Sequence, residues 1–175
     1  MLTMEQRLKN LEIPTGPVDM VLDTDAYNEI DDQFAISYAL HAKEKLNVRA
    51  LYAAPFFNDR SSGPADGMER SYQEILKLLK LSGLQCPVYR GSDRYLPDEQ
   101  TPVASDAAKH LTELAMQYSP EKPLYVLAIG AITNVASALL MKPEIADSIV
   151  VVWLGGNALE WHDNIEFNIH QDVAS

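Results

Sequence analysis

Four aspartates and one glutamate lie within ten consecutive positions of this chain, in the stretch VLDTDAYNEIDDQFAI at residues 21–36. Asp23 and Asp25 follow an apolar run, and Asp31 and Asp32 precede another. Carboxylates so close together repel one another, and a bound cation relieves that repulsion. Because there is neither a cysteine nor a histidine cluster beside these oxygen ligands, the residue types favour Ca²⁺ or Mg²⁺ over zinc. The stretch therefore predicts a site for a divalent cation.

A structural role for the same aspartates is also open. Aspartate is a preferred N-cap residue, and acidic side chains in the first turn of a helix suit its dipole. For Asp31 or Asp32 taken singly, helix capping is the simpler interpretation, and Asp23 alone could hydrogen-bond loop amides. Only the crowding of all four favours a metal site.

The alternation of apolar segments predicts how the chain positions these aspartates. Strands are expected at residues 18–25, 47–56, 87–91, 124–130 and 148–156, and helices at 31–43, 65–83, 104–118 and 133–142. Strands that are apolar on both faces and alternate with helices are typical of an α/β fold with an open, mostly parallel sheet, covered by helices on both faces. In such a sheet ligands bind beyond the carboxyl ends of the strands, where the acidic loop lies. The helix at 31–43 carries Phe34, Ala35, Tyr38, Ala39 and Ala42 at helical spacing, which is expected to be its apolar face.

Composition limits the organisation of the chain and its partners. Acidic residues outnumber basic ones by 25 to 14, and the net charge of −11 leaves no basic surface for nucleic acid or an anionic membrane. Cys86 is the only cysteine, so no disulfide framework or thiolate metal cluster is expected. No linker or repeat divides residues 1–175, which are expected to form a single domain. The polar start of the chain does not resemble a signal peptide, and we expect a cytoplasmic protein.

The acidic stretch resembles the N-terminal signature of the inosine/uridine-preferring nucleoside hydrolases, D-x-D-x-G-x-D-D followed by an apolar helix. Here the loop between the two aspartate pairs reads AYNEI, which is two residues longer than the family pattern. Further segments resemble family elements in the same order: APFFN at 54–58, AIGAITNVASAL at 128–139, WLGGN at 153–157 and EFNIHQD at 166–172. The matches span nearly all of the chain.

The resemblance implies a nucleoside hydrolase-like fold and a calcium-dependent hydrolase that cleaves the N-glycosidic bond of ribonucleosides in purine and pyrimidine salvage. It implies that the side chains of Asp25 and Asp32 and the backbone carbonyl of Thr133 ligate Ca²⁺. It also implies that Asp25 is the general base for the attacking water. The residues implied in substrate binding are Asp31, Asn58, Asn157, Glu166 and Asn168. Carboxylates near the sugar also suit an oxocarbenium-like transition state.

Several of these residues have structural interpretations as well. Asn58 tolerates turn conformations, Asn157 follows a Gly-Gly turn, and Thr133 is a suitable N-cap. Glu166 and Asn168 are two residues apart, so on a strand they would share one face.

The chain is much shorter than typical family members. It stops where a further helix is expected, so we expect the family's C-terminal part, with another calcium ligand and the base-binding groups, to be absent. Nucleoside hydrolysis by this chain is accordingly expected to be poor or absent. By analogy with the family, a homo-oligomer (a dimer or tetramer) that binds a small-molecule nucleoside is expected.

Two other functions are open. The D-x-D pattern after a strand also occurs in haloacid-dehalogenase-type Mg²⁺-dependent phosphatases, where Asp23 would be the nucleophile and Asp25 the general acid. Tyr27 stands where that family has Thr or Val, and its later lysine and acidic-pair motifs are not evident. The other alternative is a non-catalytic ribose- or metal-binding module derived from a hydrolase.

Overall fold

The strands form a parallel sheet. In the computed structural model, which describes residues 2–175, five strands pair in the order β3-β2-β1-β4-β5. Their bounds are Val18–Thr24 (β1), Leu46–Ala53 (β2), Val88–Arg90 (β3), Leu124–Ala128 (β4) and Ile149–Trp153 (β5). Every pairing within this sheet is parallel, so the carboxyl ends of the strands lie at one edge. The predicted α/β class with an open, mostly parallel sheet is confirmed.

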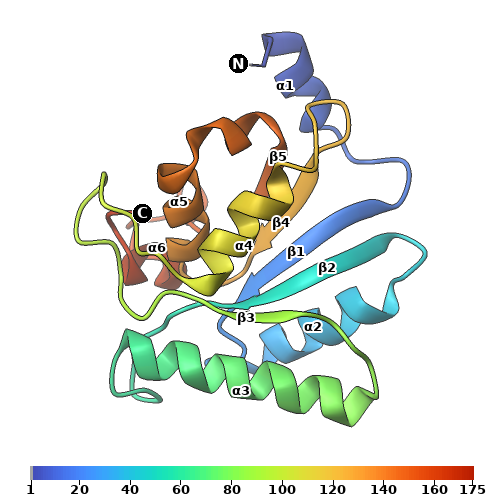
Figure 1. Cartoon of the computed structure of the whole chain (residues 1–175). Coiled ribbons are helices and arrows are strands. Elements are labelled where there is room, and N and C mark those ends of the chain that lie inside the picture. The colour runs from blue at the N-terminus through green and yellow to red at the C-terminus, as the bar shows by residue number, and fades with distance from the viewer. Residues whose placement is uncertain (1) are drawn as a thin grey trace.

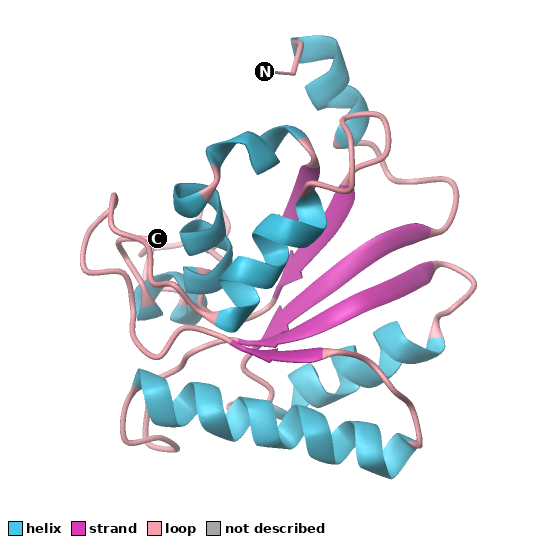
Figure 2. Ribbon diagram, in the orientation of Figure 1, coloured by secondary structure: helices cyan, strands magenta, loops and turns pink. Residues whose placement is uncertain are grey.

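Helices pack on both faces of the sheet, as Figures 1 and 2 show. Their bounds are Met4–Asn10 (α1), Ile30–His41 (α2), Pro64–Ser82 (α3), Asp106–Ala115 (α4), Thr133–Met141 (α5) and Phe167–Gln171 (α6), with a 3₁₀ helix at Pro143–Asp147 (η1). α2 and α3 contribute to the core on one face, and α4 and α5 to the core on the other. The four predicted helices lie close to their expected bounds, whereas α1, η1 and α6 are additional elements.

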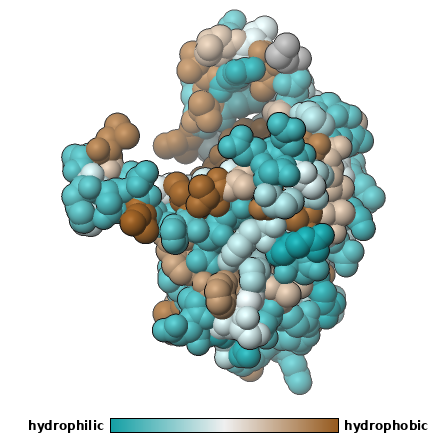
Figure 3. Space-filling view, turned by 90° about the vertical axis from the view of Figure 1, so that its left-hand side faces the viewer, coloured by the Kyte–Doolittle hydropathy of each residue, from teal (hydrophilic) through white to brown (hydrophobic). Residues whose placement is uncertain are grey.

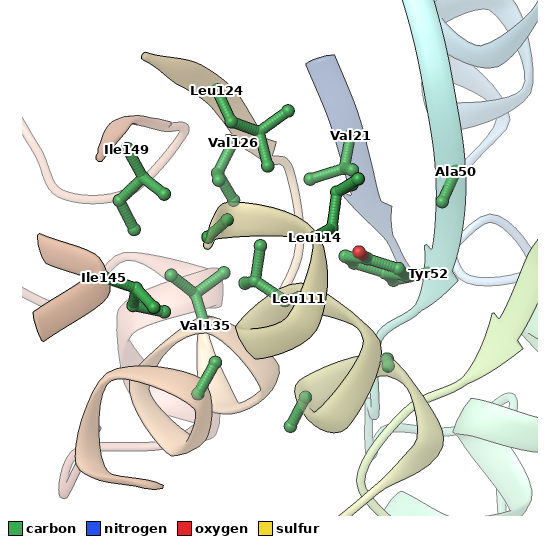
Figure 4. Close-up of a cluster of buried hydrophobic side chains, with 14 of the residues drawn as sticks. Val21, Ala50, Tyr52, Leu111, Leu114, Leu124, Val126, Val135, Ile145 and Ile149 are labelled. Atoms are coloured by element: carbon green, nitrogen blue, oxygen red, sulfur yellow. The ribbon is translucent and has the colours of Figure 1, made fainter. Parts of the chain in front are cut away.

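Two clusters of buried side chains lie on opposite faces of the sheet. Val21, Leu111 and Val126 belong to the cluster between the sheet and α4 (Figure 4). Met20 and Leu22 belong to the cluster beneath α2 and α3. Because consecutive residues of a strand point to opposite faces, β1 contributes to both clusters, and this explains its uninterrupted apolar sequence.

The buried face of α2 differs from the prediction. Phe34 and Tyr38 were expected on the apolar face of the helix, but their residues are 70% and 74% exposed. The buried face instead contains Ile36 and Leu40, which pack in the core cluster, and Asp32, which hydrogen-bonds to the last residue of β1. These three residues share one side of the helix, so the two aromatic residues are left on the other.

Hydrophobic residues also reach the surface after β5. Leu154, Trp161 and Ile165 are 60%, 57% and 67% exposed. Figure 3 shows hydrophobic (brown) residues among hydrophilic ones on the side of the molecule that lies to the left in Figure 1. Within residues 2–175 no helix combines the length and the apolar character needed to cross a membrane.

We expect Leu111→Ala to lower the free energy of unfolding by about 2–5 kcal/mol, because the substitution leaves a cavity in a close-packed cluster. Leu81→Ala is the control, since Leu81 is 74% exposed at the end of α3 and its truncation should cost less than about 1 kcal/mol. Urea denaturation followed by circular dichroism measures both changes. Equal destabilisation by the two substitutions would contradict this packing.

Candidate active site

The carboxyl end of β1 is enclosed by the two neighbouring strands. The Ala54 N–H donates to the Thr24 carbonyl at 2.9 Å, and the Ile129 N–H donates to the Asp23 carbonyl at 2.9 Å. Asp23 and Asp25 are consequently 0% and 1% exposed, which is unusual for aspartate. The first pair of predicted aspartates therefore lies within the sheet edge and not on a solvated loop.

Asp23 is held by an asparagine from α5. Its Oδ1 accepts a hydrogen bond from Asn134 Nδ2 at 2.8 Å, while its Oδ2 is buried and has no hydrogen-bond partner. Asn134 Oδ1 in turn accepts from the Ser92 N–H at 2.7 Å and from the Ser92 hydroxyl at 3.0 Å. Gly91 permits this close approach, because a Cβ there would lie 2.0 Å from the Ala53 carbonyl oxygen. One carboxylate oxygen of Asp23 is thus left unsatisfied inside the site.

Hydrogen bonds connect Asp25 to a predicted sugar-binding residue. Asn28 Nδ2 donates to Asp25 Oδ2 at 2.9 Å, and Asn28 Oδ1 accepts from Asn58 Nδ2 at 2.6 Å. The Thr24 hydroxyl donates to Asp32 Oδ1 nearby. The structure therefore brings Asp25, Asp32 and Asn58 together, with Asn28 as the link between two of them.

A further aspartate reaches the same edge from the end of the chain. Asp172 is 4% exposed, and its Oδ2 accepts a hydrogen bond from the Thr133 hydroxyl at 2.6 Å. The Leu96 N–H donates to the same oxygen at 3.1 Å. The sequence analysis assigned no role to Asp172, although it is the last residue of the EFNIHQD segment. Asn28 and Asn134 were missed as well, because a single asparagine carries no recognisable spacing.

Glu166 and Asn168 lie at the start of a helix and not on a strand. Glu166 is the N-cap of α6, and its carboxylate accepts from the N–H groups of Asn168 and Ile169 at 3.0 and 3.1 Å. Carboxylates are strong caps, which explains why a helix starts here. Asn168 is buried on that helix, and its Nδ2 donates to the Leu154 carbonyl at 2.9 Å and to the Ile129 carbonyl at 3.4 Å. Asn168 thus joins α6 to the ends of β4 and β5.

Two other predicted residues are more peripheral. Asp31 is exposed in the first turn of α2, beside buried Asp32. Asn157 is exposed, and its Nδ2 donates to the Asp163 carbonyl at 3.3 Å. Within residues 2–175 Asn157 makes no hydrogen bond to another predicted site residue, so the structure does not connect it to the buried aspartates.

Burial dominates the electrostatics of the aspartates. The pKa of Asp23 is raised to about 7, mainly by burial. The hydrogen bond from Asn134 lowers this pKa, and the charge of Asp32 raises it. Burial likewise raises the pKa of Asp32 to about 7. Burial and the charge of Asp32 hold the pKa of Asp25 well above its usual range. Each carboxyl is therefore poorly stabilised as an anion by the surrounding protein.

The donor set suits a hard cation, although the side chains do not form a complete metal cage. Among residues 2–175 no group of three or more His, Cys, Asp and Glu side chains is arranged to hold a metal. The predicted ligands are two buried carboxylates, of Asp25 and Asp32, and the backbone carbonyl of Thr133, all oxygen donors of the kind that Ca²⁺ prefers. Within residues 2–175 none of the buried aspartates makes an ion pair, and Asp23 Oδ2 has no hydrogen-bond partner. The site thus has negative charge available for a cation.

Comparison with known proteins decides the family. The sequence model of the inosine-uridine preferring nucleoside hydrolases matches residues 20–175. The chain belongs to this family. It is 30% identical to the non-specific ribonucleoside hydrolase RihC of Salmonella paratyphi A over 180 residues, which cover 90% of this chain and 56% of the relative.

Solved structures agree with this nucleoside hydrolase assignment. A purine-preferring ribonucleoside hydrolase from Gardnerella vaginalis is 25% identical, with a TM-score of 0.67 over 89% of this chain and 55% of that one. An inosine-uridine preferring nucleoside hydrolase from Bacillus anthracis is 20% identical and shares the fold, with a TM-score of 0.55 over 89% of this chain and 59% of that one. The chain spans about half the length of the curated relatives it matches.

We expect the free energy of unfolding of the metal-free protein to fall as the pH rises from about 4 to about 7. The pKa values of Asp23 and Asp32 are near 7 in the folded protein against an ordinary value of 3.8, so the folded state binds more protons in this window. Each group that titrates fully contributes a slope of about 1.4 kcal/mol per pH unit. Urea denaturation in the presence of a chelator, repeated across this pH range, measures the slope.

Substitution separates this effect from the general charge of the protein. Asp23→Asn should reduce the slope, because it removes one of the buried titrating groups. Asp19→Asn, at the opposite end of β1, should leave the slope unchanged. A slope that is the same in wild type and Asp23→Asn would show that Asp23 does not titrate in this window.

Proposed function

We propose that the chain acts in the hydrolysis of the N-glycosidic bond of ribonucleosides, with Ca²⁺ held at the carboxyl end of β1. The observation that carries this proposal is the pair of buried carboxylates, Asp25 and Asp32, which make no ion pair within residues 2–175. Asn28 links Asp25 to Asn58. Membership of the nucleoside hydrolase family supports the reaction, and the name of the RihC relative supports ribonucleosides as substrates.

In the proposed mechanism Asp25 is the general base. Asp25 accepts a proton from water as the water oxygen bonds to the anomeric carbon. The nucleobase leaves with the electron pair of the glycosidic bond. Asn28 holds Asp25 Oδ2 at 2.9 Å, which fixes the carboxylate. A Cβ at Gly130 would lie 2.9 Å from Asp25 Oδ1, so glycine leaves room at that oxygen.

Calcium would be held by the side chains of Asp25 and Asp32 and the carbonyl of Thr133. When bound, it would supply positive charge that lowers the pKa of a nearby water. The hydrogen bonds that Thr24 and Asn28 donate orient the two carboxylates before any ligand arrives. Such orientation reduces the reorganisation that binding and catalysis require.

The ribose is proposed to lie against Asp31, Asn58 and Asn168. Asn58 and Asn168 are fixed by hydrogen bonds to other site segments, and Asp31 is exposed to solvent beside buried Asp32. The carboxylate of Glu166 caps α6, so Glu166 would have to bind the sugar while it still accepts the capping hydrogen bonds. Asn157 is the predicted contact with the weakest structural support, because it bonds within its own loop.

The phosphatase alternative fits the structure less well. Its nucleophile would be Asp23, which is 0% exposed and has one oxygen held by Asn134. A nucleophile must reach the phosphorus atom of a substrate, and Asp23 lies on β1 itself, where it is paired with both β2 and β4. Asp25, the proposed general base, lies beyond the end of that strand.

The cytoplasmic location, the homo-oligomeric state and the single domain stay predictions from the sequence.

Calcium should raise the thermal midpoint of the protein. A ligand that binds only the folded state stabilises it by mass action, and at a hundredfold excess over the dissociation constant the expected shift is roughly 5–10 °C. Asp25→Asn and Asp32→Asn should each reduce the shift, because each removes a charged ligand. Differential scanning calorimetry with and without calcium measures these changes.

The matched control for this experiment is Asp19→Asn, which removes the same charge at the far end of β1. Its calcium shift should equal that of the wild type. If all four proteins respond equally to calcium, the ion binds elsewhere and the assigned ligands are wrong.

Ribose release from inosine and uridine tests the reaction itself. We expect slower release than from a full-length relative assayed beside it, because the chain spans about half the length of such relatives. Asp25→Asn should reduce the rate by a further 10²–10⁴, roughly the contribution of general base catalysis. A rate that Asp25→Asn leaves unchanged would contradict the proposed role of Asp25, and release as fast as that of the full-length relative would contradict the expected loss.

A further inference from the structure

A cavity of about 790 Å³ that is widely open to solvent lies beside the loop between β1 and α2. Three segments line it: the β1–α2 loop with the start of α2, the segment that follows β2, and the first half of α3. The lining residues used below are Tyr27, Asp59, Arg60, Arg70, Glu74 and Lys77. A cavity of this size accommodates a small molecule larger than a single ion.

The cavity wall has more cations than anions, whereas the protein as a whole is acidic. It is lined by Arg60, Arg70 and Lys77 together with Asp59 and Glu74, in a chain whose net charge is −11. Lys77 forms an ion pair with Glu74 at 3.1 Å, and Arg70 forms one with Asp66 at 2.8 Å. These two cations are therefore already partly neutralised.

Arg60 differs from the other two cations. Within residues 2–175 it makes no ion pair, and its guanidinium makes one hydrogen bond, from Nη1 to the Asn28 carbonyl at 2.7 Å. A guanidinium carries five N–H donors, so most of them have no protein partner here. The bond to Asn28 anchors the group, so Arg60 presents an oriented guanidinium that makes no ion pair within residues 2–175, although Asp59 lines the same cavity.

The cavity adjoins the proposed ribose site through a single residue. Asn28 accepts from Arg60 with its carbonyl and donates to Asp25 Oδ2 with its side chain. The neighbouring Tyr27 forms part of the wall, with the guanidinium carbon of Arg70 5.4 Å from its ring centroid. Both Tyr27 and Asn28 belong to the loop that is two residues longer than the family pattern, so this departure in sequence builds the wall between the two sites.

We propose that this cavity is an anion subsite that takes the phosphate of a phosphorylated ribosyl compound. Arg60 would hold the phosphate, with Arg70 beside it, while the ribose lies against Asp25 and Asp31. The planar guanidinium matches the spacing of phosphate oxygens and forms charge-assisted hydrogen bonds with them. The position of the ribose rests on the function proposed above, whereas the anion subsite stands on the cavity and Arg60 alone.

Isothermal titration calorimetry with ribose, ribose 5-phosphate and inorganic phosphate tests this subsite. The proteins are wild type, Arg60→Gln and Arg49→Gln. Glutamine at position 60 keeps a hydrogen-bond donor for the Asn28 carbonyl, and Arg49→Gln removes the same charge from β2, at an exposed position away from the cavity. Inorganic phosphate is titrated without added calcium to avoid precipitation.

Wild type and Arg49→Gln should bind ribose 5-phosphate at least about tenfold more tightly than ribose. Arg60→Gln should lose this preference and keep its affinity for ribose. Equal affinities of the wild type for the two sugars, or equal losses in Arg60→Gln and Arg49→Gln, would overturn the subsite.

Inorganic phosphate separates the two proposals. Phosphate binding that depends on Arg60, in a protein that does not bind ribose, would support the subsite and contradict the proposed ribose site. If the wild type binds ribose and ribose 5-phosphate equally and does not bind inorganic phosphate, the subsite is contradicted and the ribose site is not. If none of the three compounds binds, both proposals fall.

Discussion

The burial of uncompensated carboxylates at the end of β1 is the constraint on which the rest of the site depends. β1 is the middle strand of the sheet, so hydrogen bonds from the segments after β2 and β4 close over its last residues on both sides. Asp23 and Asp25 are therefore removed from water, and burial raises the pKa of each. Removing charge from water is costly unless a partner compensates it.

The protein meets this constraint with neutral hydrogen-bond donors and not with cations. Asn134 donates to Asp23, Asn28 donates to Asp25, and the Thr24 hydroxyl donates to Asp32. An arginine or lysine in the same place would stabilise the folded protein further, but it would cancel the negative charge. Amides and hydroxyls fix the carboxylates and leave that charge for a ligand. Stability given up in this way is typical of functional sites.

Segments far apart in the chain complete the site because parallel strands deliver their carboxyl ends to one edge. Asn58 follows β2, Thr133 and Asn134 follow β4, and Asp172 ends α6. On the outer side of the aspartates the longer β1–α2 loop is held by Arg60, which lines a cavity that contains both cations and anions. Asn28 contacts both sides, because its carbonyl accepts from Arg60 and its side chain donates to Asp25.

The sequence by itself determined the alternation of strands and helices along the chain and the place of the aspartates after the first strand. Periodicity and unbroken apolar runs report burial directly, because a strand covered on both faces tolerates little else. The spacing of Asp23, Asp25, Asp31 and Asp32 after such a run was enough to predict a site at that edge, and the ordered motifs gave its family.

Only the tertiary structure decided which partners those residues have. Phe34 and Tyr38 lie outside the core because Asp32 and Ile36 take the buried side of α2. Glu166 caps a helix instead of lying on a strand, and Asp172 meets Thr133 across 39 residues of chain. Local patterns fix which side chains are apolar or charged along an element, whereas the rotation of a helix and the meeting of distant polar groups are set by packing between elements.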